Sequence, residues 1–462
     1  MPKGFSSVIL AAGEGTRMKS STPKVLHTLG GKAMLAHVLD TVLGLKLDKN
    51  ALVLGHGSDI IKDYLGTRAA YRDFKLVLQP QRLGSGHAVK QAAKVFSSYR
   101  GNVLVLCADV PLIKSATLKE LMDIHKKQRN AVTVLTTIVP DPTGYGRIIR
   151  NGNGEMTKIV EEKDALAWER RIREINSGIY CFNAQKLFRI LQRLKPNNQK
   201  KEYYLTDAVE LFGRQKARIG TMLCGDYREV SGINNRRQLA EANCQLNQEI
   251  LTALMMSGVT ILDPATVWIE PTVTIGRDTT IYPGTMIQGQ TRIGEGCQIG
   301  PNTLIKEAII ANGVEIRASF IYEAEIGARA KIGPFAHVRP KTLIGEEARI
   351  GNFVEVKKSR IGRGSKVSHL TYIGDTTMGA GINIGAGVIT CNYDGANKFE
   401  TLIEDNVFVG SNVNLVAPLK IGTGAIIGAG STITEDVPPN SLALARARQV
   451  NKENWALQKK KK

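Results

Sequence analysis

The most regular pattern in the chain is an aliphatic residue that returns every six positions, for several turns at a time, across residues 268–433. A period of six fits neither the face of a helix nor the alternation of a strand. It is typical of a β-helix in which each coil contains three short parallel strands and buries their aliphatic residues. The positions that keep the period are Ile269, Ile275, Ile281, Ile287, Ile293, Ile299, Ile326, Ile332, Val338, Ile344, Ile350, Val356, Ile361, Val367, Ile373, Ile421, Ile427 and Ile433.

Glycine repeatedly follows the aliphatic position, as in Ile275-Gly276 and Ile361-Gly362. Because glycine tolerates backbone conformations that other residues avoid, we expect these glycines at the corners of the coils. The alternative is a β-sandwich with glycine turns, which would space its strands by about eight to twelve residues. The shorter period favours the β-helix.

The first half of the chain has a different pattern, in which short apolar runs alternate with segments that predict helices. The runs lie at residues 7–10, 51–54, 75–78, 102–107 and 131–137. This alternation predicts a mostly parallel, doubly wound α/β sheet. Ligands of such sheets bind beyond the carboxyl ends of the strands.

A loop of small residues, Ala11-Ala12-Gly13-Glu14-Gly15-Thr16-Arg17-Met18, follows the first run, and we expect a helix to begin near Pro23. The loop is neither a dinucleotide fingerprint, whose third glycine would fall on Met18, nor a Walker loop, which ends in GK[ST]. Its amides could approach phosphate oxygens closely. Arg17 and Lys24 add two positive charges, which favour a polyphosphate ligand over an ordinary surface turn.

Further polar residues follow the next strands: Gln79 and the loop at residues 83–87 after one, and Asp109 after another. Asp109 could hold a magnesium–phosphate complex, or it could cap the helix expected near Ser115. His87 fits a loop or capping residue better than a catalyst. All these positions fall on the ligand-binding edge.

Several motifs together resemble one family. GxGTRM followed by PK resembles the sugar-nucleotidyltransferase signature, and polar blocks follow in order at residues 144–147, 160–163, 174–178, 202–207 and 232–236. The whole series is similar to the bacterial bifunctional N-acetylglucosamine-1-phosphate uridylyltransferase and glucosamine-1-phosphate acetyltransferase family. The hexads match its left-handed β-helix, and the handedness rests on this resemblance alone. The implied fold is a Rossmann-like nucleotidyltransferase domain, a linker helix and a left-handed parallel β-helix.

The resemblance implies two reactions that give UDP-N-acetylglucosamine, a precursor of peptidoglycan and lipopolysaccharide: acetyl transfer from acetyl-CoA to glucosamine 1-phosphate, then Mg²⁺-dependent uridylyl transfer from UTP to N-acetylglucosamine 1-phosphate. For uridylyl transfer it assigns Mg²⁺ to Asp109 and Asn234, and phosphate contacts with catalytic roles to Arg17 and Lys24. The remaining implied contacts are Leu10, Ala11, Ala12, Gly13, Gln79, Gly84 and Ser85 for uridine and Gly146, Glu161 and Asn176 for the sugar. One departure is Cys107-Ala108 before Asp109, where other members often carry Tyr-Gly.

In the second half, the hexads lapse at a polar insertion, residues 391–399. Repeat proteins place binding loops at such insertions. His369 precedes it at a strand corner, where a lone histidine is often structural. Its neighbours favour a general base, because an imidazole can accept the proton of an attacking amine while Arg339 and Lys357 could hold a phosphate.

For acetyl transfer the family resemblance implies His369 as general base, with Glu355 as its orienting residue. It implies sugar-phosphate contacts from Arg339, Lys357, Tyr372 and Asn383. The implied acetyl-CoA contacts are Ala386, Asn392, Tyr393, Ser411, Ala429 and Arg446. It also implies a homotrimer whose sites combine residues of adjacent subunits.

Between the two patterns, residues 235–257 predict a helix, with apolar positions at Leu239, Ala242, Leu246, Ile250 and Leu254. We therefore expect a uridylyltransferase domain at 1–230, a linker helix at 231–257 and an acetyltransferase β-helix domain with a C-terminal tail at 258–462.

Composition narrows the remaining classes. The net charge of +20 comes from basic residues interleaved with acids, which suits anionic substrates better than nucleic acid, and we expect no nucleic-acid partner. The six cysteines are scattered, without the spacing of a zinc site. No apolar run is long enough for a membrane helix, and no signal peptide is evident, so we expect a cytoplasmic enzyme without a membrane partner.

Two other interpretations remain. A nucleotidyltransferase for another sugar could use the β-helix only for oligomerisation, but His369 and the Asn392-Tyr393 insertion disfavour it. A non-catalytic scaffold is disfavoured by the combination of Arg17, Lys24, Asp109 and Asn234. A zinc-type carbonic anhydrase would need three histidines in the β-helix, which has only His337 and His369.

Overall fold

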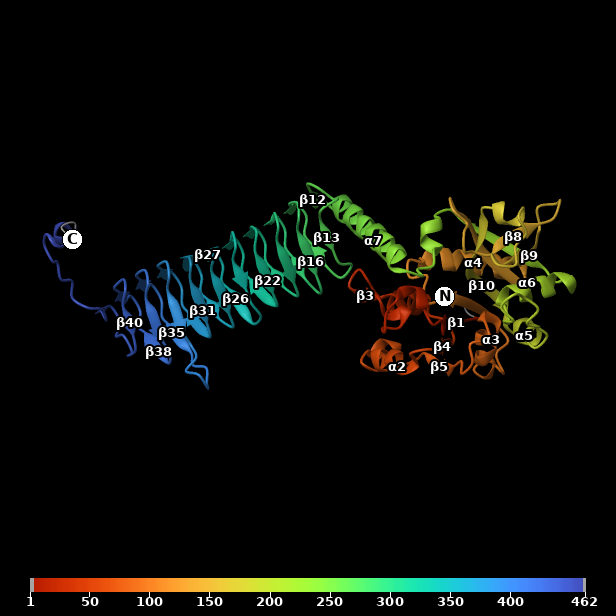
Figure 1. Ribbon diagram of the computed structural model, residues 1–462, viewed down its shortest axis with the longest axis horizontal. Helices are drawn as coiled ribbons and strands as arrows, with labels where there is room; N and C mark the ends of the chain where they lie inside the picture. Colours follow the sequence, from red (N-terminus) through yellow and green to blue (C-terminus); the bar gives the residue numbers. More distant parts are fainter. Residues whose placement is uncertain (1–3, 460–462) are drawn as a thin grey trace. The chain divides into compact units, whose positions relative to one another are not determined.

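The computed structural model describes residues 4–459 and divides into two compact units between Leu246 and Asn247. Figure 1 shows an α/β unit followed, after helix α7 (Arg236–Met256), by a long stack of short strands. Within the described residues, no helix combines the length and the apolar character needed to cross a membrane. The two units are described separately below.

The first unit is built on a nine-stranded sheet whose main order is β11-β7-β10-β6-β1-β4-β5. Strands β1, β4, β5 and β6 pair in parallel, as do β7 and β11, which confirms the predicted mostly parallel sheet. Strand β10 lies antiparallel between β6 and β7, and the β8–β9 hairpin extends from it. The bounds are β1 Phe5–Ala11, β4 Asn50–Leu54, β5 Lys75–Leu78, β6 Asn102–Cys107, β7 Val132–Ile138, β8 Arg147–Arg150, β9 Met156–Val160, β10 Glu174–Asn183 and β11 Ile219–Cys224.

Helices pack on both faces of this sheet, so the central strands β1 and β6 are buried on both sides, whereas the edge strand β5 is largely exposed. Ile9 and Leu104 pack with α1 and α4 residues, whereas Val8 and Val105 pack in a second core with α3, α5 and α6 residues. The helices are α1 Met34–Leu45, α2 Ser58–Gly66, α3 Ser85–Gln91, α4 Ser115–Gln128, α5 Ala184–Ile190 and α6 Leu205–Arg214. The alternation of strand residues between two cores explains why the runs are apolar at nearly every position.

The prediction that a helix begins near Pro23 is wrong. Residues Lys24–Leu26 form only one turn of 3₁₀ helix, and α1 begins at Met34. The hairpin of β2 (Thr28–Leu29) and β3 (Lys32–Ala33) intervenes. Gly30 and Gly31 turn this hairpin with φ of 54° and 77°, which interrupts any helix. The phosphate loop therefore ends in an irregular segment and has no helix dipole behind it.

The second unit is a β-helix of three parallel sheets with 11, 10 and 9 strands, in which each strand pairs with the third strand after it, except that β39 pairs with β41. The predicted hexad positions line one continuous core, and only Ile275, in an early coil, is partly exposed. Ile281, Ile299 and Ile316 show the stacking, because they face one another in successive coils. The three sheets start with β12 Thr260–Ile261, β13 Trp268–Ile269 and β14 Thr274–Ile275, and end with β41 Leu442–Ala443, β40 Thr432–Ile433 and β38 Leu419–Ile421.

The glycines that follow the aliphatic positions have a role other than the expected one. A Cβ on Gly276 would lie 2.7 Å from the backbone of Gly294, and a Cβ on Gly362 would lie 2.1 Å from the carbonyl oxygen of Gly379. These glycines therefore let adjacent coils approach. Left-handed corners are occupied by other residues, many of them not glycine.

Helix α7 fits the expected helical segment. Its Leu239 and Ala242 pack with Met18, Leu29 and Ile233 of the first unit. Leu251 belongs to the β-helix core, with Ile250 and Leu254 packed against it. The unit boundary falls inside the helix.

Candidate active sites

A cleft of about 690 Å³ lies at the carboxyl ends of β1, β5 and β6. It gathers every residue predicted to contact uridine, phosphate or metal. Those lining it are Leu10, Ala11, Ala12, Gly13, Arg17, Lys24, Gln79, Gly84, Ser85, Asp109 and Asn234. The cleft thus forms where the parallel strands predicted a ligand site.

The charged centre of the cleft is the Lys24 ammonium. Lys24 Nζ donates to Asp109 Oδ2 at 2.5 Å and to Asn234 Oδ1 at 2.8 Å, and Arg17 Nη2 donates to the same Asn234 oxygen at 2.7 Å. The Ile233 amide donates to the Asp109 carbonyl at 2.8 Å, which fixes Asn234 beside Asp109. A carboxylate and an amide oxygen therefore converge on one cation.

This donor pair fits a divalent cation that keeps water and substrate phosphate among its ligands. In residues 4–459, no group of three or more His, Cys, Asp or Glu side chains could hold a metal. A metal at Asp109 and Asn234 would therefore depend on the bound nucleotide for further oxygen ligands.

Asp109 does not cap the helix after it. Helix α4 begins at Ser115 without a side-chain cap, and the Lys114 amide donates to Glu229 Oε1 at 2.9 Å. The capping interpretation of Asp109 is therefore wrong, because Glu229 accepts from this helix end.

The three predicted sugar contacts form a group beside the residues that line the cleft. The Asn176 amide donates to the Gly146 carbonyl at 2.9 Å, and a Cβ on Gly146 would lie 3.6 Å from Glu161 Oε2. Thr206 donates to Glu161 Oε1 at 3.1 Å. Burial raises the pKa of Glu161 despite that hydrogen bond. The Glu161 carboxyl, next to Gly146, can accept hydrogen bonds from sugar hydroxyls.

Cys107 links this group to the cleft wall. Its thiol lies against Gly178, whose amide donates to Asn176 Oδ1 at 3.1 Å. Burial, reinforced by the charge of Asp109, raises the pKa of Cys107 to about 12. The thiol is therefore protonated at neutral pH and serves as wall, not as nucleophile.

His87 contacts Gln79, one of the residues that line the cleft. It lies in α3, and its two ring nitrogens are 3.0 Å from Gln79 Nε2 and 2.9 Å from Gln91 Nε2. His87 therefore lies inside a helix, and not in a loop or at a cap as predicted; it contacts the Gln79 side chain, whose Nε2 also donates to Gly84 O at 3.2 Å.

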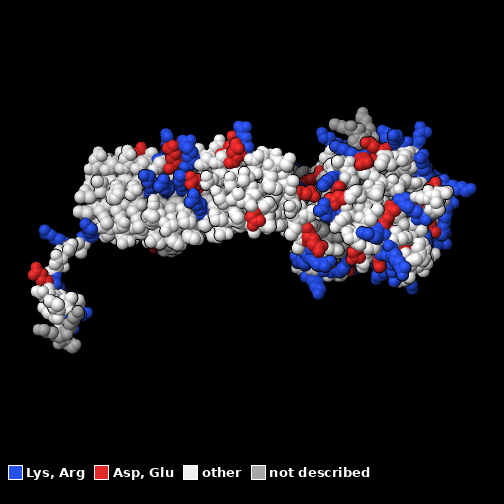
Figure 2. Space-filling view, turned by 90° about the horizontal axis from the view of Figure 1, so that it is seen from above, with Lys and Arg blue, Asp and Glu red and all other residues white. Residues whose placement is uncertain are grey.

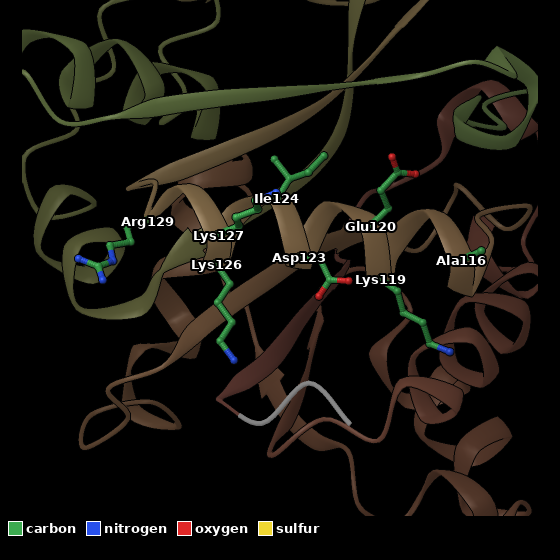
Figure 3. A pocket seen from close by; sticks show the side chains of 8 residues that line it. All are labelled: Ala116, Lys119, Glu120, Asp123, Ile124, Lys126, Lys127 and Arg129. Atoms are coloured by element: carbon green, nitrogen blue, oxygen red, sulfur yellow. The ribbon is translucent and has the colours of Figure 1, made fainter.

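A wider hollow of about 1030 Å³ lies along α4 (Figure 3). Its rim mixes basic and acidic residues, among them Lys119, Glu120, Asp123 and Lys126. None of the predicted site residues lines it. Figure 2 shows basic residues interleaved with acidic ones over one face of the α/β unit.

In the β-helix, His369 ends strand β30 (Lys366–His369) and is exposed. Its Nδ1 lies 2.7 Å from Oδ1 of Asn352, the residue that faces it one coil earlier. The expectation that Glu355 orients His369 is not met, because Glu355 instead accepts from Arg339 Nη1 at 2.7 Å. Sequence reasoning missed Asn352, and only the coil register reveals it.

The residues predicted to contact the sugar phosphate lie in successive coils of the β-helix. Tyr372 faces Glu355 in the next coil, and Asn383 faces Lys366. Lys357 Nζ donates to Asp375 Oδ2 at 3.1 Å. Asp375 was also missed by sequence reasoning.

The predicted acetyl-CoA contacts fall into two sets. Ala386, Ser411, Ala429 and Arg446 form a column: the amide after Ser411 donates to Ala386 O, the amide after Ala429 donates to Ser411 O, and Arg446 Nη1 donates to Ala429 O at 3.0 Å. Asn392 and Tyr393 lie in the 391–399 insertion, which projects as a loop in the blue part of the β-helix (Figure 1). An antiparallel bridge between Tyr393 and Lys398 closes this loop.

A nucleotide cleft on a doubly wound sheet, joined in one chain to a parallel β-helix, defines a nucleotidyltransferase with an attached hexapeptide-repeat domain. The nucleotidyl transferase family model matches residues 6–227, and the bacterial transferase hexapeptide model (six repeats) matches residues 272–307, 323–358 and 400–435.

The chain is 48% identical over 453 residues to the bifunctional protein GlmU of Halalkalibacterium halodurans, covering 98% of both. It is 50% identical over 449 residues to that of Geobacillus sp. (strain WCH70), covering 97% of both. For the protein of Syntrophomonas wolfei the identity is 47%, over 96% of this chain and 98% of the relative. The chain therefore belongs to the family of bifunctional GlmU proteins. It is an enzyme with acetyltransferase and uridylyltransferase activities, and its family depends on a divalent metal.

Proposed function

We propose that the cleft of the first unit transfers uridylyl from UTP to N-acetylglucosamine 1-phosphate with Mg²⁺. The observation that carries this proposal is the convergence of Asp109 and Asn234 oxygens on the Lys24 ammonium. The Asp109 and Asn234 oxygens already stabilise one positive charge, so they suit a divalent cation. The Lys24 ammonium that they contact suits a phosphate group of the substrate.

The reaction brings two anions together, because the phosphate of the sugar attacks the α-phosphate of UTP and pyrophosphate leaves. Bound at Asp109 and Asn234, Mg²⁺ would supply positive charge against this repulsion. Arg17 and Lys24 bind phosphate oxygens, and Lys24 stabilises the charge on the leaving pyrophosphate. The 11–18 loop and Gln79 orient the nucleotide, while Gly146, Glu161 and Asn176 orient the sugar. The nucleophile is already ionised, so no general base is required.

We propose that the β-helix transfers acetyl from acetyl-CoA to glucosamine 1-phosphate before the uridylyl step. Asn352 Oδ1 accepts a hydrogen bond from the Nδ1–H of His369, so in the neutral imidazole Nε2 carries no proton and can take one from the amine. The amine then attacks the thioester carbonyl, and the coenzyme A thiolate leaves. Arg339 and Lys357 bind the phosphate, Tyr372 and Asn383 orient the sugar, and the column from Ala386 to Arg446 with Asn392 and Tyr393 holds the coenzyme.

We also propose a homotrimer, on the basis of an exposed row of apolar corners. Phe335, Phe353 and Leu370 occupy successive corners beside His369 and are 59%, 57% and 63% exposed. All three have left-handed backbone, with φ of 59°, 55° and 49°, which costs energy for large side chains. Phe335 and Phe353 stack with ring centroids 5.3 Å apart. Burial against a second copy would offset that cost.

The domain limits of 1–230, 231–257 and 258–462 are part of this proposal, as is a cytoplasmic location, where nucleotide and acetyl donors are made. The described cysteines are all free thiols, which fits a reducing compartment.

The test is a coupled assay of the purified protein with glucosamine 1-phosphate, acetyl-CoA, UTP and Mg²⁺, in which free thiol and pyrophosphate are measured separately. We expect both products, with thiol preceding pyrophosphate. Pyrophosphate formed only when N-acetylglucosamine 1-phosphate is supplied would contradict the acetyl-transfer half. Thiol without pyrophosphate would contradict the uridylyl half.

A further inference from the structure

One corner of the β-helix differs from the others in its row. The corners that follow the second sheet have left-handed backbone at Glu307, Glu323, Lys341, Lys358 and Asp375. The first four are exposed charged residues, as expected for a solvent-facing edge. Asp375 is only 3% exposed, and Asn392 of the 391–399 insertion contacts it. A buried carboxylate needs partners that compensate for lost water.

Three side chains supply that compensation, and they come from two directions. From the coil before, Lys357 Nζ donates to Asp375 Oδ2 at 3.1 Å, and Lys358 Nζ lies 3.1 Å from Oδ1. From the insertion, Asn392 Nδ2 donates to Oδ2 at 2.5 Å. Burial alone would raise the pKa of Asp375, but the ion pair with Lys358 and the hydrogen bonds from Lys357 and Asn392 outweigh it and lower the pKa below its usual value.

The backbone of Asp375 contributes as well. Its amide donates to Lys357 O at 3.1 Å, and its carbonyl accepts from the Thr401 amide at 3.2 Å, just beyond the insertion. Lys398, near that end of the loop, lies close enough to Lys357 for the neighbouring ammonium to lower the pKa of Lys398. Both ends of the insertion are therefore tied to one residue and to Lys357 beneath it.

We propose that Asp375 is a positioning residue for acetyl transfer, which fixes the phosphate-binding Lys357 and the coenzyme-binding Asn392 relative to each other. This inference rests on the proposed function, which gives Lys357 and Asn392 their ligands. The Asp375 carboxylate touches neither substrate. It acts by holding one side chain from the acceptor site and one from the donor site on the same oxygen, so that the two substrates meet in register.

The experiment is Asp375→Asn, which keeps the size of the side chain and removes its charge. Steady-state acetyl transfer is measured while glucosamine 1-phosphate and acetyl-CoA are varied in turn. We expect KM to rise at least about fivefold for both substrates, because the two sites lose a shared anchor, with uridylyl transfer unchanged. The matched control is Glu323→Gln, at an exposed corner of the same row, which should leave every constant unchanged.

Hydrogen exchange separates positioning from general loss of fold. In Asp375→Asn, amides of residues 392–401 should exchange faster, while those of coils before residue 340 keep wild-type protection. If this variant does not fold, Asp375→Glu retains the charge and moves the carboxylate by one methylene, and the same paired rise in KM is expected.

A rise for one substrate alone, or wild-type constants in a folded variant, would overturn the inference. Absence of acetyl transfer in the wild-type protein would instead overturn the proposed function, so the two failures are distinguishable.

Discussion

In the uridylyl cleft, hydrogen bonds join residues as far as 217 positions apart, such as Arg17 and Asn234. In the acetyl site, partners stand about one coil apart: 17 positions for Asn352 and His369, and 18 for Lys357 and Asp375. The first site is gathered from loops at the edge of a sheet, and its charged centre is complete within one chain. The second consists of side chains paired between successive coils on the surface of the β-helix. Its proposed general base, His369, is exposed next to the row of apolar corners.

This difference predicts how the two activities can be separated. A change in the cleft should disable one reaction through charge. A change in the β-helix should disable the other by disturbing the alignment of side chains in successive coils, or by removing the proposed contact between copies at the exposed corner.

The largest expected effect is that of Asp109→Ala. Removal of the carboxylate takes the negatively charged partner away from Lys24 and removes one of the two proposed metal ligands. Uridylyl transfer, measured as pyrophosphate release, should fall roughly 10³-fold or more, the scale on which charge stabilisation acts in phosphoryl transfer. Acetyl transfer should be unchanged. Asp123→Ala, an exposed acid on α4, is the matched control, and an equal loss there would refute the assignment.

His369→Ala should lower acetyl transfer by roughly 10²- to 10⁴-fold, the usual contribution of a general base. Pyrophosphate release from UTP and N-acetylglucosamine 1-phosphate should remain at the wild-type rate. His337→Ala removes the other β-helix histidine, which packs edge-on against Phe320 and Tyr322, and should retain acetyl transfer. Retained acetyl transfer in His369→Ala would contradict the assigned base.

The double substitution Phe335→Asn with Phe353→Asn tests the apolar row. Asparagine tolerates left-handed backbone, so the isolated coil should not be destabilised. If the proposed homotrimer forms through this row, light scattering should show a smaller particle than for the wild-type protein, and acetyl transfer should fall about tenfold or more and become dependent on protein concentration. Uridylyl transfer should be insensitive. A trimer that survives both changes would show that this row is not the contact.

Substitutions of Asn352 and Glu355, which test which of the two residues orients His369, should have smaller effects on acetyl transfer. Asn352→Ala should lower acetyl transfer about tenfold, a fraction of what a general base contributes, and alter its pH profile by removing the contact to His369 Nδ1. Glu355→Gln loses the charge opposite Arg339 and should mainly raise KM for the sugar phosphate. The reverse pattern would restore Glu355 as the orienting residue.

These contacts show what the sequence could predict. The six-residue period located the β-helix core, because every coil repeats the same burial. It could not pair Asn352 with His369 or Lys357 with Asp375, since coil length varies by a residue and one shift changes every partner. The phosphate role of the loop before Pro23 and Lys24 stays a prediction, although both Arg17 and Lys24 line the cleft, and the Gly30-Gly31 hairpin replaced the expected helix.

The smallest expected effect is on how the stability of the first unit depends on acidic pH. His125 is buried in the first unit, where desolvation lowers its pKa to about 4. The unfolded chain takes up this proton near pH 6.5, so stability is lost as pH falls from about 6.5 toward 4, by about 3 kcal/mol at most. Urea unfolding of wild type and His125→Asn should show a shallower pH dependence in the variant over this window. Equal slopes would place the acid sensitivity elsewhere.

The most direct test of two separate sites is complementation between variants. Purified Asp109→Ala and His369→Ala are each assayed alone and then together, from glucosamine 1-phosphate, acetyl-CoA and UTP to UDP-N-acetylglucosamine. Each variant alone should form little product, and the mixture should restore it, because the acetylated sugar phosphate made by one protein can be used by the other. A mixture that stays inactive while both proteins are folded would contradict two independent sites in one chain.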